Sequence, residues 1–165
     1  MVKNLLKACF MMAALTAAGQ AAAETYTVGS GGTYRPFEFE NSQKQLEGFD
    51  IDIIKAIAKA EGFDVKLVNT PWEGIFATLN TGDRDIIISG ITITDKRKQM
   101  VDFSAPYFPA EQSIVVAQDS QVDSLAALKN EKVGVVNSST GDIVVSEVLG
   151  KNSTAIKRFD NTPLM

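Results

Sequence analysis

Three basic residues, Lys96, Arg97 and Lys98, end the run that begins Ser89-Gly-Ile-Thr-Ile-Thr-Asp95. Thr94 is a good N-cap and Asp95 suits a first helical turn, so a short helix should begin here. Cations beside the positive end of a helix oppose its dipole at about 0.3–1 kcal/mol each, and an incoming anion would relieve that conflict. The pattern predicts an anion-binding site. The alternative is that all three cations are solvated surface charges.

Two aromatic residues and a polar turn could complete such a site. Tyr34 and Trp72 each follow a predicted strand end. Two flat apolar faces can hold an aliphatic chain between them, although both residues could instead belong to the core. The turn Asn137–Gly141 leads from a predicted strand into a helix, and its free N–H groups could hold a carboxylate. Capping alone would also explain the Ser and Thr residues of this turn.

The composition excludes several kinds of chemistry. The chain of 165 residues has no histidine and one cysteine, Cys9, which lies near the N-terminus. Ser-His and Cys-His nucleophile pairs and zinc ligand sets are therefore absent beyond the first residues, and no disulfide is expected. We predict no catalytic residues, no metal site and no cofactor.

The first 23 residues have the pattern of a secretory signal peptide. Lys3 and Lys7 precede an apolar stretch over residues 8–18, and a run of alanines ends at Ala23. The stretch is shorter than the roughly 20 residues that a membrane span needs. Lys7 lies two residues before Cys9 and spoils the pattern of a lipid-attachment cysteine. Removal of this segment would leave 14 basic and 20 acidic residues, a net charge of −6, so nucleic acid is not an expected partner.

The elements that must position these residues alternate in type. Short apolar runs alternate with amphipathic helical patterns, as in an α/β fold with a largely parallel sheet. Before residue 110 the patterns predict strands at Thr25–Val28, Asp64–Val68 and Asp85–Ser89, the last buried on both faces, and helices at Asp50–Glu61 and Trp72–Leu79. Extended stretches follow at Phe103–Tyr107 and Ser113–Ala117.

The pattern starts afresh after Ala110, where we place a lobe boundary. Helices are predicted at Ser124–Lys129 and Thr140–Leu149, and strands at Lys132–Val136 and Thr154–Phe159. Asn161-Thr-Pro163 would begin a further helix. We therefore expect a signal peptide at 1–23, the N-terminal part of a first lobe at 24–110 and an incomplete second lobe at 111–165, with Met165 at the start of an element.

Four motifs together resemble bacterial solute-binding protein family 3, the polar and basic amino-acid receptors of ABC importers. They are Tyr34-Arg-Pro-Phe-Glu-Phe39, Gly48-Phe-Asp-Ile-Asp52, Gly90–Arg97, and Asp102-Phe-Ser104 with Tyr107. The resemblance implies the two-lobed type II periplasmic-binding-protein fold, closing over one free L-amino acid. It also implies a periplasmic location, a membrane permease as partner and no enzymatic activity; we expect a monomer.

The resemblance also assigns roles to residues. Arg97 would clamp the ligand carboxylate, because its planar fork matches a carboxylate bidentately, and the Thr140 N–H would join it. The Gly90 carbonyl and the Thr92 hydroxyl would receive the ammonium. The remaining predicted contacts surround the ligand side chain: Tyr34 and Trp72 on either side, Ser89 at the floor and Asn137 nearby.

Two departures from the family pattern bear on the ligand. Many members place an acidic residue three positions before the first aromatic residue, and here that position is Gly31. Either the ligand lacks a strong positive charge or another acid, such as Glu38, takes this role. The family's aspartate that completes the ammonium site comes from a C-terminal region beyond Met165.

Two other functions remain open from the sequence. The same fold is similar to that of secreted dehydratases acting on cyclohexadienyl acids, and fold alone does not exclude an enzyme. An acidic side chain with a raised pKa facing the ligand would favour that alternative. An extracellular sensor domain is the second alternative, and it would need a membrane span after the present end.

Overall fold

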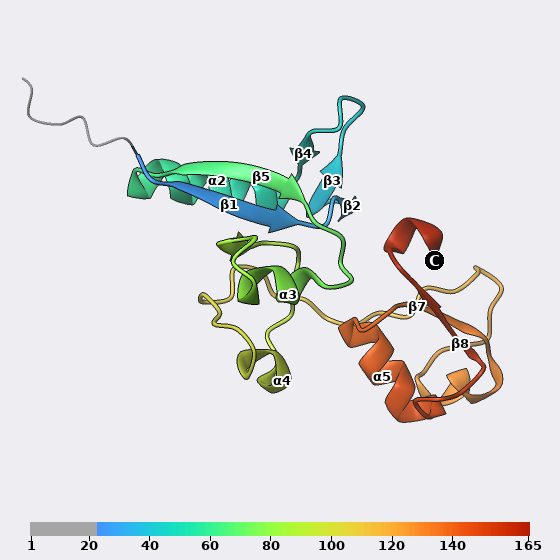
Figure 1. The fold of residues 1–165 in the computed structure, drawn as a ribbon. Coiled ribbons are helices and arrows are strands. Elements are labelled where there is room, and N and C mark those ends of the chain that lie inside the picture. The colour runs from blue at the N-terminus through green and yellow to red at the C-terminus, as the bar shows by residue number, and fades with distance from the viewer. Residues whose placement is uncertain (1–22) are drawn as a thin grey trace, which may run out of the picture.

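The computed structural model describes residues 23–165, so the predicted signal segment, apart from Ala23, and Cys9 lie outside the described residues. The elements form two groups joined by an extended stretch (Figure 1). The first group contains strands β1 (Thr25–Ser30), β2 (Thr33–Tyr34), β3 (Glu38–Glu40), β4 (Leu46–Glu47), β5 (Asp64–Asn69) and β6 (Ile86–Ile87) and helices α2 (Phe49–Glu61), α3 (Ile75–Asn80) and α4 (Asp95–Lys98). None of the helices described is long and apolar enough to cross a membrane.

The first group is built on a parallel sheet in the order β5-β1-β6. Helix α2 runs along β1 and β5 (Figure 1). It begins after Gly48, carries acidic residues in its first turn and ends at Gly62, whose left-handed φ of 77° stops the helix. The core joins Val28 of β1, Ile54 of α2 and Ile88 after β6, each at most 8% exposed. The parallel strands therefore end at one edge, where the next residues can meet.

A second, antiparallel sheet in the order β2-β3-β4 was missing from the sequence prediction. Its strands have two or three residues each, too short for an alternating pattern to be recognised. Strand β3 pairs with β2 through Tyr34 and Glu38. This small sheet therefore places the predicted aromatic residue next to a glutamate.

The second group is a smaller parallel pair, β7 (Val133–Val136) and β8 (Ile156–Phe159), with helix α5 (Thr140–Leu149) and the 3-10 turns η1 (Ala126–Asn130) and η2 (Thr162–Leu164). Leu128, Val135, Val145 and Ile156 form its core. The predicted bounds of α5 are confirmed. Strand β7 starts one residue later than predicted and β8 two residues later. The turn at 162–164 begins where a further helix was expected, with the Asn161 side chain accepting from the Leu164 N–H at 3.2 Å.

Three predicted elements differ in the structure. Helix α3 starts at Ile75 instead of Trp72, because Gly74 adopts a left-handed φ of 81° that interrupts the helix. Strand β6 has only two residues, and both are half-exposed because β6 is an edge strand with one neighbour, so burial on both faces was wrong. The helix expected at Ser124–Lys129 is the 3-10 turn η1.

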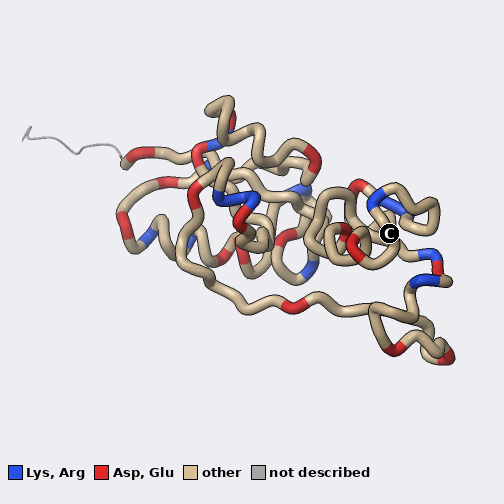
Figure 2. Tube along the Cα trace, turned by 90° about the horizontal axis from the view of Figure 1, so that it is seen from below, with Lys and Arg blue, Asp and Glu red and all other residues tan. Residues whose placement is uncertain are grey.

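An extended stretch joins the two groups. Between Phe103 and Asp119 the structure describes neither helix nor strand, and most of these side chains are exposed. Figure 2 shows the positions of acidic and basic residues along the backbone, which are spread over both groups. The predicted lobe boundary near Ala110 falls within this stretch and stays a prediction.

Candidate ligand-binding site

The ends of β1 and β6 meet through Ser89. The Gly31 N–H donates to the Ser89 hydroxyl oxygen at 3.0 Å, and that hydroxyl donates to Glu38 Oε1 at 2.7 Å. Ser89 is 5% exposed. Gly90 follows with a φ of +54°, and a Cβ atom there would lie 3.1 Å from two ring atoms of Tyr34. Ser89, Gly90 and Tyr34, which were predicted separately, therefore lie together.

Arg97 is a buried cation on a very short helix. The Thr94 hydroxyl caps α4 by accepting from the Arg97 N–H at 3.2 Å, as predicted. Nη1 of Arg97 donates to the Thr92 carbonyl at 2.8 Å, and the side chain is 6% exposed. Burial lowers the pKa of Arg97. None of the ion pairs of the described residues involves Arg97, so its charge has no acidic partner there.

Two aromatic rings flank this guanidinium. Its central carbon lies 5.2 Å from the ring centroid of Trp72 and 5.4 Å from that of Phe76. The two rings meet edge to face at 6.1 Å. Phe76 was not predicted as a site residue, although the helical spacing Trp72 to Phe76 could have indicated it. Among the described aromatic pairs, none joins Trp72 to Tyr34, which stacks on Phe37 at 5.4 Å.

Residues 137–140 reach this region from the second group of elements. The indole Nε1 of Trp72 donates to the Asn137 carbonyl at 2.9 Å. The hydroxyl oxygens of Thr92 and Thr140 lie 3.5 Å apart, and the Gln112 amide donates to the Thr140 hydroxyl at 3.1 Å. Five of the predicted residues, Trp72, Thr92, Arg97, Asn137 and Thr140, are thus joined by direct contacts.

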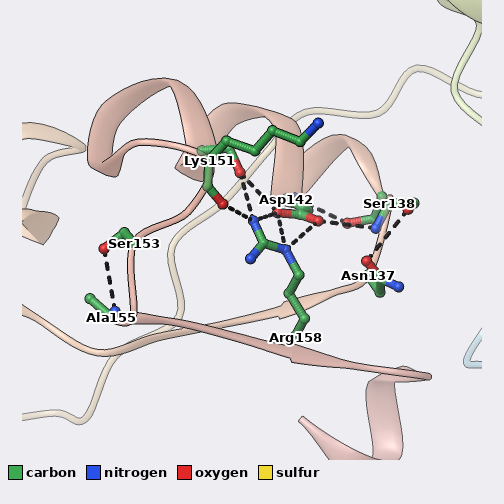
Figure 3. A network of polar contacts seen from close by, with 9 residues as sticks. Asn137, Ser138, Asp142, Lys151, Ser153, Ala155 and Arg158 are labelled. Carbon is green, nitrogen blue, oxygen red and sulfur yellow. Dashed lines mark hydrogen bonds and ion pairs between the residues drawn. The ribbon is translucent and has the colours of Figure 1, made fainter.

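An ion pair supports the turn that carries Asn137 and Thr140 (Figure 3). Arg158 Nε lies 3.0 and 2.9 Å from the two carboxylate oxygens of Asp142, and the Ser138 N–H donates to Oδ2 at 3.1 Å. Burial alone would raise the pKa of Asp142, but the hydrogen bonds from Arg158, Ser138 and Ser146 hold it below its usual value. The pair fixes Ser138, whose φ of +58° is unfavourable outside glycine.

Two buried carboxyl groups lie behind Ser89 and Gly90. Glu38 is 2% exposed and Asp50 is fully buried. Asp50 accepts from the Gly90 N–H at 2.6 Å and from the Tyr107 hydroxyl at 2.9 Å. The sequence analysis quoted Asp50 and Tyr107 in motifs without giving them a role, because only the tertiary structure brings them to Gly90.

The chain belongs to the bacterial extracellular solute-binding proteins, family 3, because that family's model matches residues 26–162. The resemblance stated above is therefore confirmed. A probable histidine-binding protein of Neisseria gonorrhoeae is 46% identical over 143 residues, which cover 86% of this chain and 53% of that relative. The chain spans about half the length of the curated relatives it matches.

Solved structures agree with the family match. The arginine-, lysine-, histidine-binding protein ArtJ of Geobacillus stearothermophilus superposes with a TM-score of 0.81 at 40% identity, over 86% of this chain and 60% of that one. AncCDT-1 is an ancestral amino acid-binding protein described as a precursor of cyclohexadienyl dehydratase. It superposes with a TM-score of 0.77 at 42% identity, over 83% of this chain and 61% of that one. The predicted fold is confirmed: this chain has part of the two-lobed type II periplasmic-binding-protein fold.

Proposed function

We propose that this chain is part of the substrate-binding component of an ABC importer and binds a polar or basic L-amino acid outside the cytoplasm. The observation that carries the proposal is Arg97, a buried guanidinium without an acidic partner among the described residues, held beside Trp72. A buried charge is costly unless it is paired, so this position suits a ligand carboxylate. The names of the relatives support an amino acid as the ligand.

The ligand contacts follow the roles implied by the family. Arg97 and the Thr140 N–H hold the carboxylate, and the Gly90 carbonyl and the Thr92 hydroxyl receive the ammonium. Tyr34 and Trp72 enclose the side chain, with Ser89 beneath it and Asn137 beside it. The contacts from Trp72 to Asn137 and from Thr92 to Thr140 support this arrangement, because a ligand there would touch both groups of elements.

Glu38 supplies the acidic group that many family members have at the position of Gly31. Its carboxyl group lies next to Ser89, and a Cβ atom on Gly31 would lie 3.4 Å from Oε1. With no side chain at position 31, Oε2 of Glu38 lies 4.0 Å from where a Cβ atom on Gly90 would be, beside the Tyr34 ring. A ligand whose side chain ends in a cation or an amide donor fits it.

The partner and the location follow from the same proposal. The chain acts as a monomer and delivers its ligand to the membrane permease of the importer. It resides in the periplasm, a location that the names of several relatives support. The signal peptide predicted at 1–23 would direct its export.

A thermal-shift screen of the twenty amino acids against the full-length protein tests the proposed function. A ligand at 100 times its dissociation constant stabilises the folded state by roughly 2.7 kcal/mol, which gives a clear shift in the unfolding midpoint. We expect the largest shifts from arginine, lysine, histidine or glutamine. Tight binding of a sugar, a metal ion or a dicarboxylate, without a response to any L-amino acid, would contradict the proposal.

One observation favours an enzyme as the second candidate. Glu38 is a buried acid whose pKa is raised to about 8, chiefly by burial, and AncCDT-1 is described as the precursor of a dehydratase. A general acid needs such a pKa, but it must also reach the substrate. Incubation with prephenate or arogenate separates the two functions, and we expect no turnover.

A further inference from the structure

Glu38 of β3 and Asp50 of α2 differ in how their oxygens are satisfied. Both oxygens of Asp50 accept hydrogen bonds, from the Gly90 N–H at 2.6 Å and the Tyr107 hydroxyl at 2.9 Å. Oε1 of Glu38 accepts from the Ser89 hydroxyl at 2.7 Å. Its other oxygen, Oε2, is buried, and no donor of the described residues reaches it. Both oxygens of Asp50 thus have donors that stabilise a negative charge, whereas only one oxygen of Glu38 has a donor.

A proton on Glu38 resolves this difference. A buried carboxylate oxygen without a donor is unfavourable, whereas a protonated carboxyl group carries no charge. Burial, with a contribution from the charge of Asp50, raises the pKa of Glu38 to about 8 against the opposing hydrogen bond from Ser89. Burial also raises the pKa of Asp50, against the opposing hydrogen bonds from the Gly90 N–H and the Tyr107 hydroxyl. Because both oxygens of Asp50 have donors and Oε2 of Glu38 has none, a proton on this pair belongs on Glu38 and the negative charge on Asp50.

None of the ion pairs within residues 23–165 involves Glu38 or Asp50, and no cation contributes to the pKa shift of either group. Helix α2 contributes Asp50, and the stretch after β6 contributes the neutral Ser89 and Gly90. The extended stretch contributes Tyr107, whose pKa is raised by burial and by Asp50, so that it remains a neutral donor. The described residues thus supply no positive charge to an ionised Glu38, and a cationic ligand could supply it.

The unsatisfied oxygen of Glu38 lies close to Gly90 and Tyr34, two residues with proposed ligand contacts. A Cβ atom on Gly90 would lie 4.0 Å from Oε2 and 3.1 Å from the Tyr34 ring. Gly31 and Gly90 present no side chain that would separate Glu38 from a ligand held at that ring. The end of an amino-acid side chain beside Tyr34 is therefore within reach of the carboxyl group.

We propose that Glu38 and Asp50 share one proton in the ligand-free site, and that a cationic ligand side chain expels this proton, so that the pair sets the specificity between cationic and neutral amino acids. The proposal rests on the proposed function. The proton leaves Glu38 for solvent, the carboxylate that remains pairs with the ligand cation, and no other bond changes. A neutral ligand such as glutamine leaves the proton in place and bonds to the protonated carboxyl group.

The proposal fixes how affinity depends on pH. Below about pH 8 the free site holds the proton, so binding of a cation must release it, and arginine affinity rises with pH by up to about tenfold per unit. Above about pH 8 the proton is already gone and the affinity levels off. Glutamine affinity stays flat between pH 6 and 7, where the free site already holds the proton and none moves on binding. Arginine is the suitable probe since its guanidinium keeps its charge throughout.

Calorimetric titration of the full-length protein at pH 7, in phosphate and in Tris, counts the released protons, because these buffers differ in ionisation enthalpy. We expect nearly one proton released per arginine and none per glutamine. In Glu38→Gln, arginine should release none and bind at least tenfold more weakly, while glutamine affinity changes less than threefold. The matched control is Glu40→Gln, on the same strand beside Lys44, which should behave as the unaltered protein.

Carbon-13 NMR titration of the glutamate side chains reads the shared proton without any ligand. We expect Glu38 to titrate near pH 8, and a midpoint near 4.5 would overturn the shared proton whatever the protein binds. Arginine binding without proton release would overturn the release step and leave the proposed function standing. If no amino acid binds, the proposed function and the release step fail together, and the NMR midpoint still decides whether the proton is shared.

Discussion

Arg97 and Lys96 are neighbours on one helical turn with opposite surroundings. The Arg97 side chain is buried between the Thr92 carbonyl and the rings of Trp72 and Phe76. Lys96 is exposed. Lys98 pairs with Asp95 at 3.6 Å on the surface. Of the three cations, only Arg97 is placed to meet a ligand away from water, so the solvated-face alternative applies to the two lysines alone.

Substitutions should separate these cations in ligand affinity. In the full-length protein Arg97→Ala should cost about 2–5 kcal/mol of binding free energy, roughly thirtyfold to several thousandfold, because the ligand carboxylate loses a bidentate partner away from water. Arg97→Lys should recover only part of this, since a point charge does not reproduce the fork. Lys96→Ala is the matched control, and it should change affinity by less than about 1 kcal/mol, an effect that shrinks with added salt.

Calorimetric titration of these three variants gives the comparison. A Kd for Arg97→Ala equal to that of the parent, or a larger loss in Lys96→Ala, would mean that the carboxylate clamp has been assigned to the wrong residue.

The sequence led to the contact residues and to Glu38 as a possible acid, but it gave no role to Asp50 behind them. Arg97, Thr92 and Trp72 stand in or near recognisable motifs, and the structure brings them together. Asp50 looked like an ordinary acidic residue in a first helical turn, and only the fold places its carboxylate under the Gly90 N–H. Burial of a charged side chain depends on distant segments, so neither periodicity nor spacing could indicate it.

At the scale of elements, the turn before α2 positions Asp50. Gly48 has a φ of 123°, and the next two N–H groups donate to the carbonyls of Pro36 at 3.1 Å and Phe37 at 2.9 Å. A Cβ atom at position 48 would collide with those same backbone atoms of Phe37 and Pro36. The close approach between this turn and the segment before β3 therefore requires glycine.

Gly48→Ala should lower the free energy of unfolding by about 2–5 kcal/mol, which combines an unfavourable backbone conformation with a backbone clash. Gly62→Ala is the matched control, because Gly62 also has a positive φ, of 77°, but nothing lies within 4 Å of its Cβ position. That variant should lose only about 1–2 kcal/mol. Urea denaturation compares the two, and equal losses would show that the close approach at Gly48 contributes nothing.

Long, periodic elements were predicted well, whereas the short strands were not; the short helix α4 was predicted from its Thr94 cap. The predicted α5 matches residue for residue, and the predicted α2 starts one residue late. Strand β6 and the β2-β3-β4 sheet have strands of two or three residues, whose existence depends on partners across the fold. Helix α3 starts three residues after its predicted start, because the sequence did not show that Gly74 has a positive φ. Local patterns predict an element when it is long enough to show a period or when it begins at a recognisable cap.

At the scale of the whole molecule, the two groups of elements meet at the proposed ligand position. Side-chain contacts join them through Trp72 to Asn137 and Thr92 to Thr140. The extended stretch between Phe103 and Asp119 has neither helix nor strand. Amide hydrogen exchange of the ligand-free protein should therefore be slowest in β1, β5 and α2, intermediate in β7, α5 and β8 with their smaller core, and fast in the stretch.

Ligand binding should alter this exchange pattern in both groups at once. An amino acid held by Arg97 and the Thr140 N–H stabilises the two segments together, so exchange should slow by about tenfold or more at residues 90–98 and at 137–142, while the interiors of β1 and β5 change little. The Arg97→Ala protein at the same ligand concentration is the control and should show no slowing in either segment. Slowing in residues 90–98 alone would mean that the ligand is held by one group, and that Asn137 and Thr140 take no part in binding.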